Sequence, residues 1–313
     1  MRLLKILPET PKFDFIGRRV IALAFTAVII LGSFATLATR GLNFGIDFAG
    51  GILIEVKTPG PADLGAMRAT LSGLGLGEVA LQTFGAPSDV LIRVQRQPGD
   101  EKAQLSALQA VKQALGQTVE YRRTELVGPK VGDELVRDGV MAVLFSIVAI
   151  AAYVWFRFEW QFGVGALVAT FHDVIATFGL FSITGMEFNL TVVAAILTIA
   201  GYSINDTVVE YDRVRENLRK YKVMPLFDLL NQSVNETLSR TILTGGTTLL
   251  ALMSLYFLGG EVLSGFSLAM IFGVLIGTYS SVYVAMPVLY YFDLRRDGGG
   301  TERDEPAEER TAG

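Results

Sequence analysis

Residues 190–206 read LTVVAAILTIAGYSIND, and this stretch decides the fold. The run from Leu190 to Ala200 is long enough for a helix and carries no charge, and Asp206 closes the stretch. An aspartate in a soluble loop costs nothing, whereas a charged side chain at the centre of a membrane costs about 2.5–3.5 kcal/mol even on the lenient insertion scale. Whether Asp206 has a function therefore depends on whether this segment spans a membrane.

The composition indicates that it does. Hydrophobic residues make up 51% of the 313 residues and charged residues only 19%, whereas about a quarter of a typical globular domain is charged. The chain has no cysteine and a single histidine, His172, which excludes disulfides, thiol catalysis and histidine-rich metal clusters. The net charge of −4 and the lack of a basic array with interleaved aromatic residues argue against a nucleic-acid partner.

Six apolar segments are long enough to cross a hydrocarbon core of about 30 Å, which takes about 20 helical residues. They cover residues 20–39, 140–156, 162–184, 190–209, 241–258 and 262–292. The first could pass for a signal peptide, but it is too long for one, and no small-residue cleavage site follows before Arg40. We therefore expect a membrane α-helical fold whose first helix is a retained anchor and whose second to sixth helices form a bundle over 140–292.

Lysine and arginine in the short loops predict the orientation. They gather in residues 1–19 and 210–240 and just after residue 292, whereas the loops 185–189 and 259–261 have none. By the positive-inside rule, both termini and the segment 210–240 are cytoplasmic. The glycine-rich, charged tail 293–313 has the composition of a disordered segment.

Residues 40–139 then lie outside the membrane, and they show the pattern of a small folded domain. Alternating apolar residues predict strands at 52–57, 79–84, 90–94 and 118–126, and helical spacing predicts helices at 64–74 and 105–115. The order β-α-β-β-α-β is that of a ferredoxin-like α+β unit. A further amphipathic stretch, 224–239, lies on the membrane surface, leads into the fifth span, or is an ordinary elbow helix.

Ionisable residues within the expected spans are few. His172 and Asp173 lie about halfway along the third span, Asp206 follows Asn205 toward the cytoplasmic end of the fourth, and Arg240 opens the fifth. Ion pairing favours a charged carboxylate and desolvation favours a neutral one, so an aspartate near an arginine can hold a proton in one helix packing and lose it in another. A proton-driven machine needs such a switch, with Asn205 leading water toward the carboxylate.

Other interpretations of these residues stay open. Each could belong to a buried polar cluster that only ties helices together, and His172 with Asp173 could be a simple packing pair. Arg240 could instead be an anchor whose charge reaches the membrane surface.

Residues 45–51 read GIDFAGG, just after the first span. Further motifs are RFEW at 157–160, HD at 172–173, EFNLT at 187–191, GYSINDTVV at 201–209, DRVREN at 212–217 and SRT at 239–241. Together they resemble the SecD/SecF family of protein-export membrane proteins, in the resistance-nodulation-division (RND) superfamily, whose signature is G-I-D-F-x-G-G. The resemblance covers nearly the whole chain except the tail, but Glu210 and Tyr211 stand where apolar residues are expected.

The resemblance implies a partner and a function. The superfamily works as twelve spans in two related halves, so SecD would supply the other half. The pair would use the proton motive force at the SecYEG channel of the bacterial cytoplasmic (inner) membrane, to promote late steps of preprotein translocation after ATP-driven insertion by SecA. Unfolded preprotein, YajC, YidC and membrane lipids are further expected partners. Protons would be the coupling ion, and no cofactor is expected.

The resemblance also implies roles for individual residues. Asp206 matches the proton-coupling acid, Arg240 its basic partner, and His172 with Asp173 a polar pair. The signature residues Gly45, Asp47, Gly50 and Gly51 would lie in a hinge of the external domain over residues 40–51, because glycine tolerates large backbone changes.

Two other functions are considered. A small-molecule or lipid transporter of the same superfamily would need a deep pocket in large external domains, and a domain of about 100 residues is small for that. An intramembrane aspartyl protease would need Asp173 and Asp206 to share a proton at close range. The arginine and histidine expected nearby argue against it, so we expect no enzyme.

Overall fold

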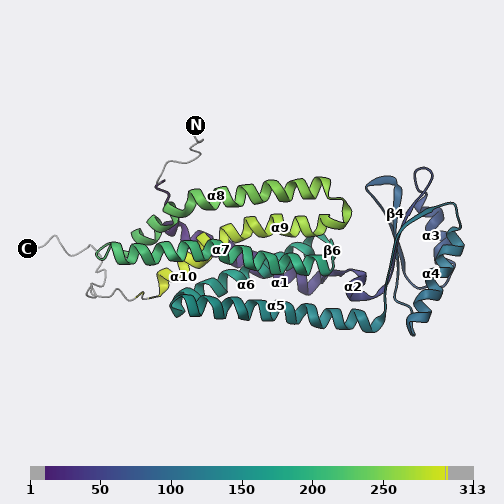
Figure 1. The fold of residues 1–313 in the computed structure, drawn as a ribbon, viewed down its shortest axis with the longest axis horizontal. Helices are drawn as coiled ribbons and strands as arrows, with labels where there is room; N and C mark the ends of the chain where they lie inside the picture. Colours follow the sequence, from purple (N-terminus) through teal and green to yellow (C-terminus); the bar gives the residue numbers. More distant parts are fainter. Residues whose placement is uncertain (1–10, 293, 295–313) are drawn as a thin grey trace, which may run out of the picture.

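The computed structural model describes residues 11–292 and 294. A long helical bundle carries a small α+β domain at one end, and both ends of the described chain lie at the opposite end of the bundle (Figure 1). The helices of the bundle are α1 (Arg19–Arg40), α5 (Pro129–Arg157), α6 (Trp160–Thr184), α7 (Leu190–Lys220), α8 (Leu226–Leu258) and α9 (Glu261–Ser280). The last span continues through the π-helix η2 (Ser281–Ala285) into α10 (Met286–Tyr291). Six helical segments of the described chain are long and apolar enough to cross a membrane, which confirms the predicted count.

The helices extend beyond the apolar segments that predicted them. The second span was expected to begin at 140, but helix α5, which contains it, begins at Pro129, so the last residues of the predicted external segment 40–139 are already helical. Proline is well suited to a first helical turn, and the charged residues that follow it conceal the start of the helix from hydropathy. At the other end, α7 runs to Lys220 and α8 begins at Leu226, so most of the segment 210–240 is helix.

The amphipathic stretch 224–239 leads directly into the fifth span as the first part of α8. It also binds the segment before α1. The side chain of Asn231 accepts hydrogen bonds from the backbone of Phe15 and Ile16, and that of Asn235 accepts one from Phe13. The tail 293–313, expected to be disordered, lies outside the described residues except for Leu294, which is buried.

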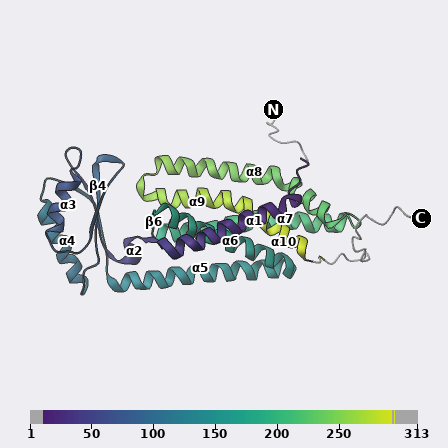
Figure 2. The ribbon, with the colours of Figure 1, turned by 180° about the vertical axis from the view of Figure 1, so that it is seen from behind.

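Three helices form the buried centre of the bundle. Figure 2 shows α1 crossing α6 on the rear face, and the apolar stretches of α6, α7 and the last span are 50–61% buried, against 6–17% in α1, α5 and α8. Glycines set the closest approaches. A Cβ at Gly179 of α6 would meet Ser33 of α1, and Gly273 and Gly277 of α9 lie against Ile199 and Ser203 of α7. Small residues allow such approaches in membranes, where lipid is as apolar as the side chains.

The external domain has the predicted β-α-β-β-α-β order. Its elements are β2 (Gly51–Lys57), α3 (Leu64–Ser72), β3 (Val79–Phe84), β4 (Ala86–Val94), α4 (Glu101–Leu115) and β5 (Glu120–Val127). The strands form an antiparallel sheet in the order β3-β4-β2-β5. Ile52, Ile54 and Ile92 are fully buried in the core with Leu71 of α3 and Val111 of α4. Because α3 and α4 lie on the side away from the bundle, the other face of the sheet is turned toward the bundle (Figure 1).

Candidate functional site

Asp173 is the centre of a buried polar cluster that joins three helices. Its side chain, on α6, is 0% exposed. Its Oδ2 accepts hydrogen bonds from Ser203 Oγ of α7 at 2.5 Å and from Ser280 Oγ of α9 at 2.8 Å. Its Oδ1 lies 3.0 Å from Nδ1 of His172, which is 2% exposed. A carboxyl can be buried here because both of its oxygens have polar partners.

Asp206 lies about one turn from Ser203 toward the expected cytoplasmic end of α7. Its side chain is 5% exposed, and its Oδ2 has no hydrogen-bond partner among the described residues. The charge of Arg240, on α8, acts on Asp206, although the two form no ion pair within 4.0 Å in this structure. The structure thus makes the two residues neighbours without closing a salt bridge. A carboxyl group held this way can gain or lose a proton without breaking a hydrogen bond of its own.

The protease interpretation needs Asp173 and Asp206 to share a proton. Both oxygens of Asp173 are instead occupied by His172, Ser203 and Ser280. In the described chain, no hydrogen bond joins the two aspartates. The structure therefore shows no aspartyl dyad.

The structure separates Asn205 from the buried group. Successive residues of an α-helix are rotated by about 100°, so neighbours in sequence point in different directions. The side chain of Asn205 is exposed, whereas Asp206 is buried. A role for Asn205 in leading water to Asp206 stays a prediction, and it would have to act from the outer face of α7.

Glu210 is a buried carboxyl that sequence reasoning did not assign to the site. It is 1% exposed and lies four residues after Asp206, on the same side of α7. The sequence did contain a signal for Glu210, because it follows the assigned acid Asp206 by four residues, about one helical turn. The buried polar residues on α7 are Ser203, Asp206, Thr207, Glu210 and Asn217. They form a stripe from the middle of the bundle toward its expected cytoplasmic end.

The external signature is docked onto the bundle. Its flanking strand β1 (Asn43–Phe44) pairs in parallel with β6 (Glu187–Phe188), and its middle forms the short helix α2 (Ile46–Ala49). Asp47 Oδ2 accepts a hydrogen bond of 2.9 Å from the backbone N–H of Leu190, at the start of α7. A carboxylate at a helix N-terminus satisfies a free N–H group and interacts favourably with the helix dipole.

Because the signature segment contacts the bundle, fewer of residues 40–51 are free to act as the expected hinge. Gly45 donates a backbone hydrogen bond to Phe188, and a Cβ at Gly45 would meet Glu187. Gly50 and Gly51 have φ values of +71° and +123°, in the region that favours glycine. Hinge motion stays a prediction, and the pair Gly50 and Gly51 is where the chain can best accommodate it.

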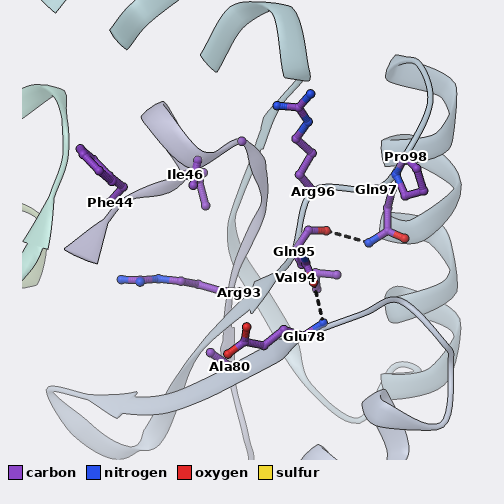
Figure 3. A pocket seen from close by; sticks show the side chains of 12 residues that line it. Phe44, Ile46, Glu78, Ala80, Arg93, Val94, Gln95, Arg96, Gln97 and Pro98 are labelled. Atoms are coloured by element: carbon purple, nitrogen blue, oxygen red, sulfur yellow. Dashed lines mark hydrogen bonds between the residues drawn. The ribbon is translucent and has the colours of Figure 1, made fainter. Parts of the chain in front are cut away.

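Two clefts lie where the external domain meets the bundle. One, of about 390 Å³, lies between the sheet and the end of the bundle. The other, of about 710 Å³, is lined by Phe44 and Ile46 on one side and by the ends of β3 and β4 on the other (Figure 3). Its polar lining consists of Arg93, Arg96, Glu78 and two glutamines, Gln95 and Gln97. The cleft is open rather than enclosed, whereas small-molecule sites bury most of the surface of their ligand, so its shape does not favour a small-molecule or lipid transporter.

Comparison with known proteins agrees with this geometry. Residues 107–295 match the family model of the C-terminal region of the protein export membrane proteins SecD/SecF, and residues 35–58 match that of the SecD/SecF GG motif. The chain belongs to the SecD/SecF family. It is 46% identical over 297 residues to a protein translocase subunit SecF of Rickettsia rickettsii, covering 94% of this chain and 96% of that protein. A SecF of Rickettsia bellii is 47% identical over 293 residues, with coverage of 92% and 96%.

Solved SecDF structures share the fold. A crystal structure of SecDF, a translocon-associated membrane protein from Thermus thermophilus, matches 91% of this chain with a TM-score of 0.80 and 36% identity. A structure of SecDF in a super-membrane-facing form matches 89% with a TM-score of 0.65 at the same identity. This chain spans only 39% and 38% of the lengths of those chains. Equal identity with unequal TM-scores indicates that the two SecDF structures differ in arrangement.

In this member of the SecD/SecF family, an ion pair links the external domain to the bundle. Arg93 of β4 donates a hydrogen bond to Glu187 of β6. Burial raises the pKa of the Glu187 carboxyl; Arg93 lowers that pKa, while repulsion from Asp47 and Glu125 raises it further. Docking therefore favours the protonated form of Glu187, despite its cationic partner.

We expect docking of the external domain to tighten as the external pH falls. A carboxyl whose pKa is higher in the docked state binds its proton more tightly there, so protonation stabilises docking, and this stabilisation is lost as pH rises through the raised pKa. Because the chain has no cysteine, spin labels can be attached at Ser106→Cys and Leu258→Cys. The docked fraction in their distance distribution should rise as the pH falls toward the ordinary glutamate pKa of about 4.3.

The Glu187→Gln variant should show a docked fraction that no longer depends on pH. Glu101→Gln, on the exposed surface of α4, is the matched control and should behave as the unmodified chain. A docked fraction that decreases at low pH would mean that the Arg93 ion pair dominates, contrary to this expectation.

Proposed function

We propose that this chain is one half of an accessory unit of the Sec translocase that uses the proton motive force. With SecD as the other half, it would promote late steps of preprotein translocation through SecYEG across the bacterial inner membrane. The observation that carries this proposal is Asp206, a buried carboxyl with a free oxygen beside the charge of Arg240, in the membrane-spanning α7. Intramembrane acids of this kind mark ion and proton pathways.

The outer face of α7 supports a second half. Its exposed residues Ala194, Thr198, Gly201 and Asn205 recur at helical spacing and are small or polar. A lipid-facing surface would be expected to carry larger apolar side chains, whereas small residues let another helix approach closely. This chain spans about two fifths of the length of the SecDF chain. The remaining part of a SecDF chain could therefore correspond to the second half.

The energy available suits this role. One charge that crosses the membrane gains about 2.3 kcal/mol per 100 mV of potential. A few protons per cycle could therefore shift the external domain between two arrangements, and the two SecDF structures support the existence of such arrangements in the family. The positive-inside pattern supports an orientation with both termini in the cytoplasm. SecYEG, YajC and YidC remain expected partners.

The test of this proposal is Asp206→Asn, which keeps the shape of the side chain but cannot release a proton. Preprotein translocation is measured in inverted inner-membrane vesicles that contain SecYEG, SecA and the SecD partner, with and without a proton motive force. We expect the stimulation by the proton motive force to fall to the level of vesicles that lack this chain. Translocation driven by ATP alone should be unchanged.

Asp138→Asn is the matched control. Asp138 lies on the neighbouring α5, is exposed, and pairs with Arg137 at 3.4 Å. A surface ion pair contributes about 0–1 kcal/mol, so this variant should retain the stimulation. Full stimulation in Asp206→Asn would overturn the proposed proton coupling.

A further inference from the structure

Burying the carboxyl group of Glu210 in the bundle is unfavourable in free energy, and no hydrogen bond from a described side chain offsets this. Its Oε2 is buried and has no hydrogen-bond partner among the described residues. Burying a polar group without a hydrogen bond is unfavourable, and burying an unpaired charge is much more so. A role in tying helices together, which explains Asp173, does not explain Glu210, because no described side chain donates a hydrogen bond to it.

The neighbour of Glu210 shows the contrast. Tyr211 also has a buried hydroxyl without a partner, but its ring packs against Phe158 and Phe162 with centroids 6.0 and 5.0 Å away. Aromatic packing therefore accounts for Tyr211. No comparable contact accounts for the carboxyl group of Glu210.

Glu210 lies between Asp206 and a cleft at the expected cytoplasmic end. Residues four apart on a helix have Cβ atoms about 5–6 Å apart, and the charge of Asp206 acts on Glu210. The next turn of α7 reaches a cleft of about 320 Å³ in the groove between α7 and α8. It is lined by Val209, Asp212, Arg213, Glu216, Glu236, Thr237 and Arg240.

The polar contacts of this groove continue beyond the cleft. Asn217 donates hydrogen bonds to Ser233 at 3.0 Å and to Glu236 at 2.9 Å. Arg213 lies 3.7 Å from Glu236. Glu236, at the rim of the cleft, is thus an acid that can exchange protons with water. It lies about two helical turns beyond Glu210.

The charged groups on the elements around Glu210 are few. On α8 they are Arg240 and Glu236, and on α5 Arg157, which is paired with Asp212. The cytoplasmic half of α6, from Trp160 to Phe171, carries no charged residue, and η2 and α10 bring only tyrosines as titratable groups. Asp206 is therefore the nearest acid with which Glu210 could exchange a proton along α7.

We propose that Glu210 is a second proton-binding carboxyl, which carries the proton between Asp206 and the cleft. This inference rests on the proposed function. Protonated Glu210 releases its proton to water in the cleft, and protonated Asp206 then transfers its own proton to the Glu210 carboxylate. Asp206 becomes a carboxylate, which the charge of Arg240 stabilises, until it takes up a proton from the other side of the membrane. One proton enters and one leaves in each cycle, and both acids return to their protonated forms.

The test compares Glu210→Gln and Glu210→Asp in the same vesicles, with Glu159→Gln, exposed before α6 and outside the cleft, as the matched control. The rate stimulated by the proton motive force is measured against the pH on the cytoplasmic side. Glu210→Gln should lower it at least tenfold, because positioned proton-transfer groups contribute about 10²–10⁴-fold, and should alter its pH profile. Glu210→Asp should restore part of the rate, and ATP-driven translocation should not change.

The outcomes separate this inference from the proposed function. Full stimulation with an unaltered pH profile in Glu210→Gln, while Asp206→Asn abolishes stimulation, overturns the role of Glu210 alone. Full stimulation in both variants overturns the proposed function. Equal losses in Glu210→Gln and Glu210→Asp, with less complex recovered in detergent, would show that Glu210 acts through packing and would also overturn the inference.

Discussion

Replacing Asp173 with alanine is expected to destabilise the bundle by more than about 2 kcal/mol, because several buried side chains lose the acceptor that they share. The change leaves Ser203, Ser280 and His172 without the acceptor that joins α6, α7 and α9. Each buried donor that is left without an acceptor lowers the stability of the fold by about 1–3 kcal/mol. The measurement is the free energy of unfolding of the purified protein in detergent, monitored by denaturant titration.

The matched control is Asp212→Ala, which removes an exposed ion pair and should cost no more than about 1 kcal/mol. The Asp173→Asn variant then distinguishes the two roles left open for this residue. The amide can still accept from Ser203 and Ser280, so stability should be largely retained. Retained proton coupling in this variant would assign Asp173 to structure, whereas lost coupling would assign it to the proton pathway. An alanine variant as stable as the unmodified chain would contradict the importance of the cluster.

Replacing Gly273 with leucine is expected to prevent close packing of α9 on α7. Even a Cβ at this position would overlap Cγ1, Cδ1 and Cγ2 of Ile199. Overpacking a core costs about 1–3 kcal/mol, and occasionally more. Here α9 would have to move away, which would also break the hydrogen bonds Ser280–Asp173 and Ser281–Thr207. We therefore expect a loss above about 3 kcal/mol or a failure to accumulate, measured by denaturant titration and by yield.

Gly201→Leu is the matched control, because no atom lies within 4 Å of a Cβ at Gly201. The chain alone should stay stable, but less SecD should copurify with it if this face of α7 binds the second half. Normal copurification would refute the proposed pairing face. A stable Gly273→Leu variant would show that α9 does not depend on this close approach.

Much of the fold follows from local patterns in the sequence. The six spans follow from the free energy of transferring apolar helices into lipid, and the order of the external domain follows from strand and helix periodicity. Helix ends were predicted poorly where a helix leaves the membrane. The charged start of α5 after Pro129 and the end of α7 at Lys220 are helical although they are not apolar.

The candidate site was predictable in part. Asp206, His172 and Asp173 stand out because polar residues are costly in an apolar segment, but the partners of Asp173 come from two other helices. Asn205 was grouped with Asp206 because the two are adjacent, although the helix turns them to different sides. The signature around Asp47 was expected to be only a hinge, and its contact with Leu190, far along the chain, could not be seen in the sequence.

The sequence by itself determined which segments enter the membrane and that Asp206 lies among them, because hydropathy and periodicity belong to each segment alone. Only the tertiary structure decided which side chains meet. That depends on how each helix is rotated about its axis, and the rotation is set by close contacts such as Gly273 with Ile199 and Gly179 with Ser33. Those contacts place Asp173 among its three donors. They also turn Glu210 into the interior and leave Asn205 and Gly201 on an outer face.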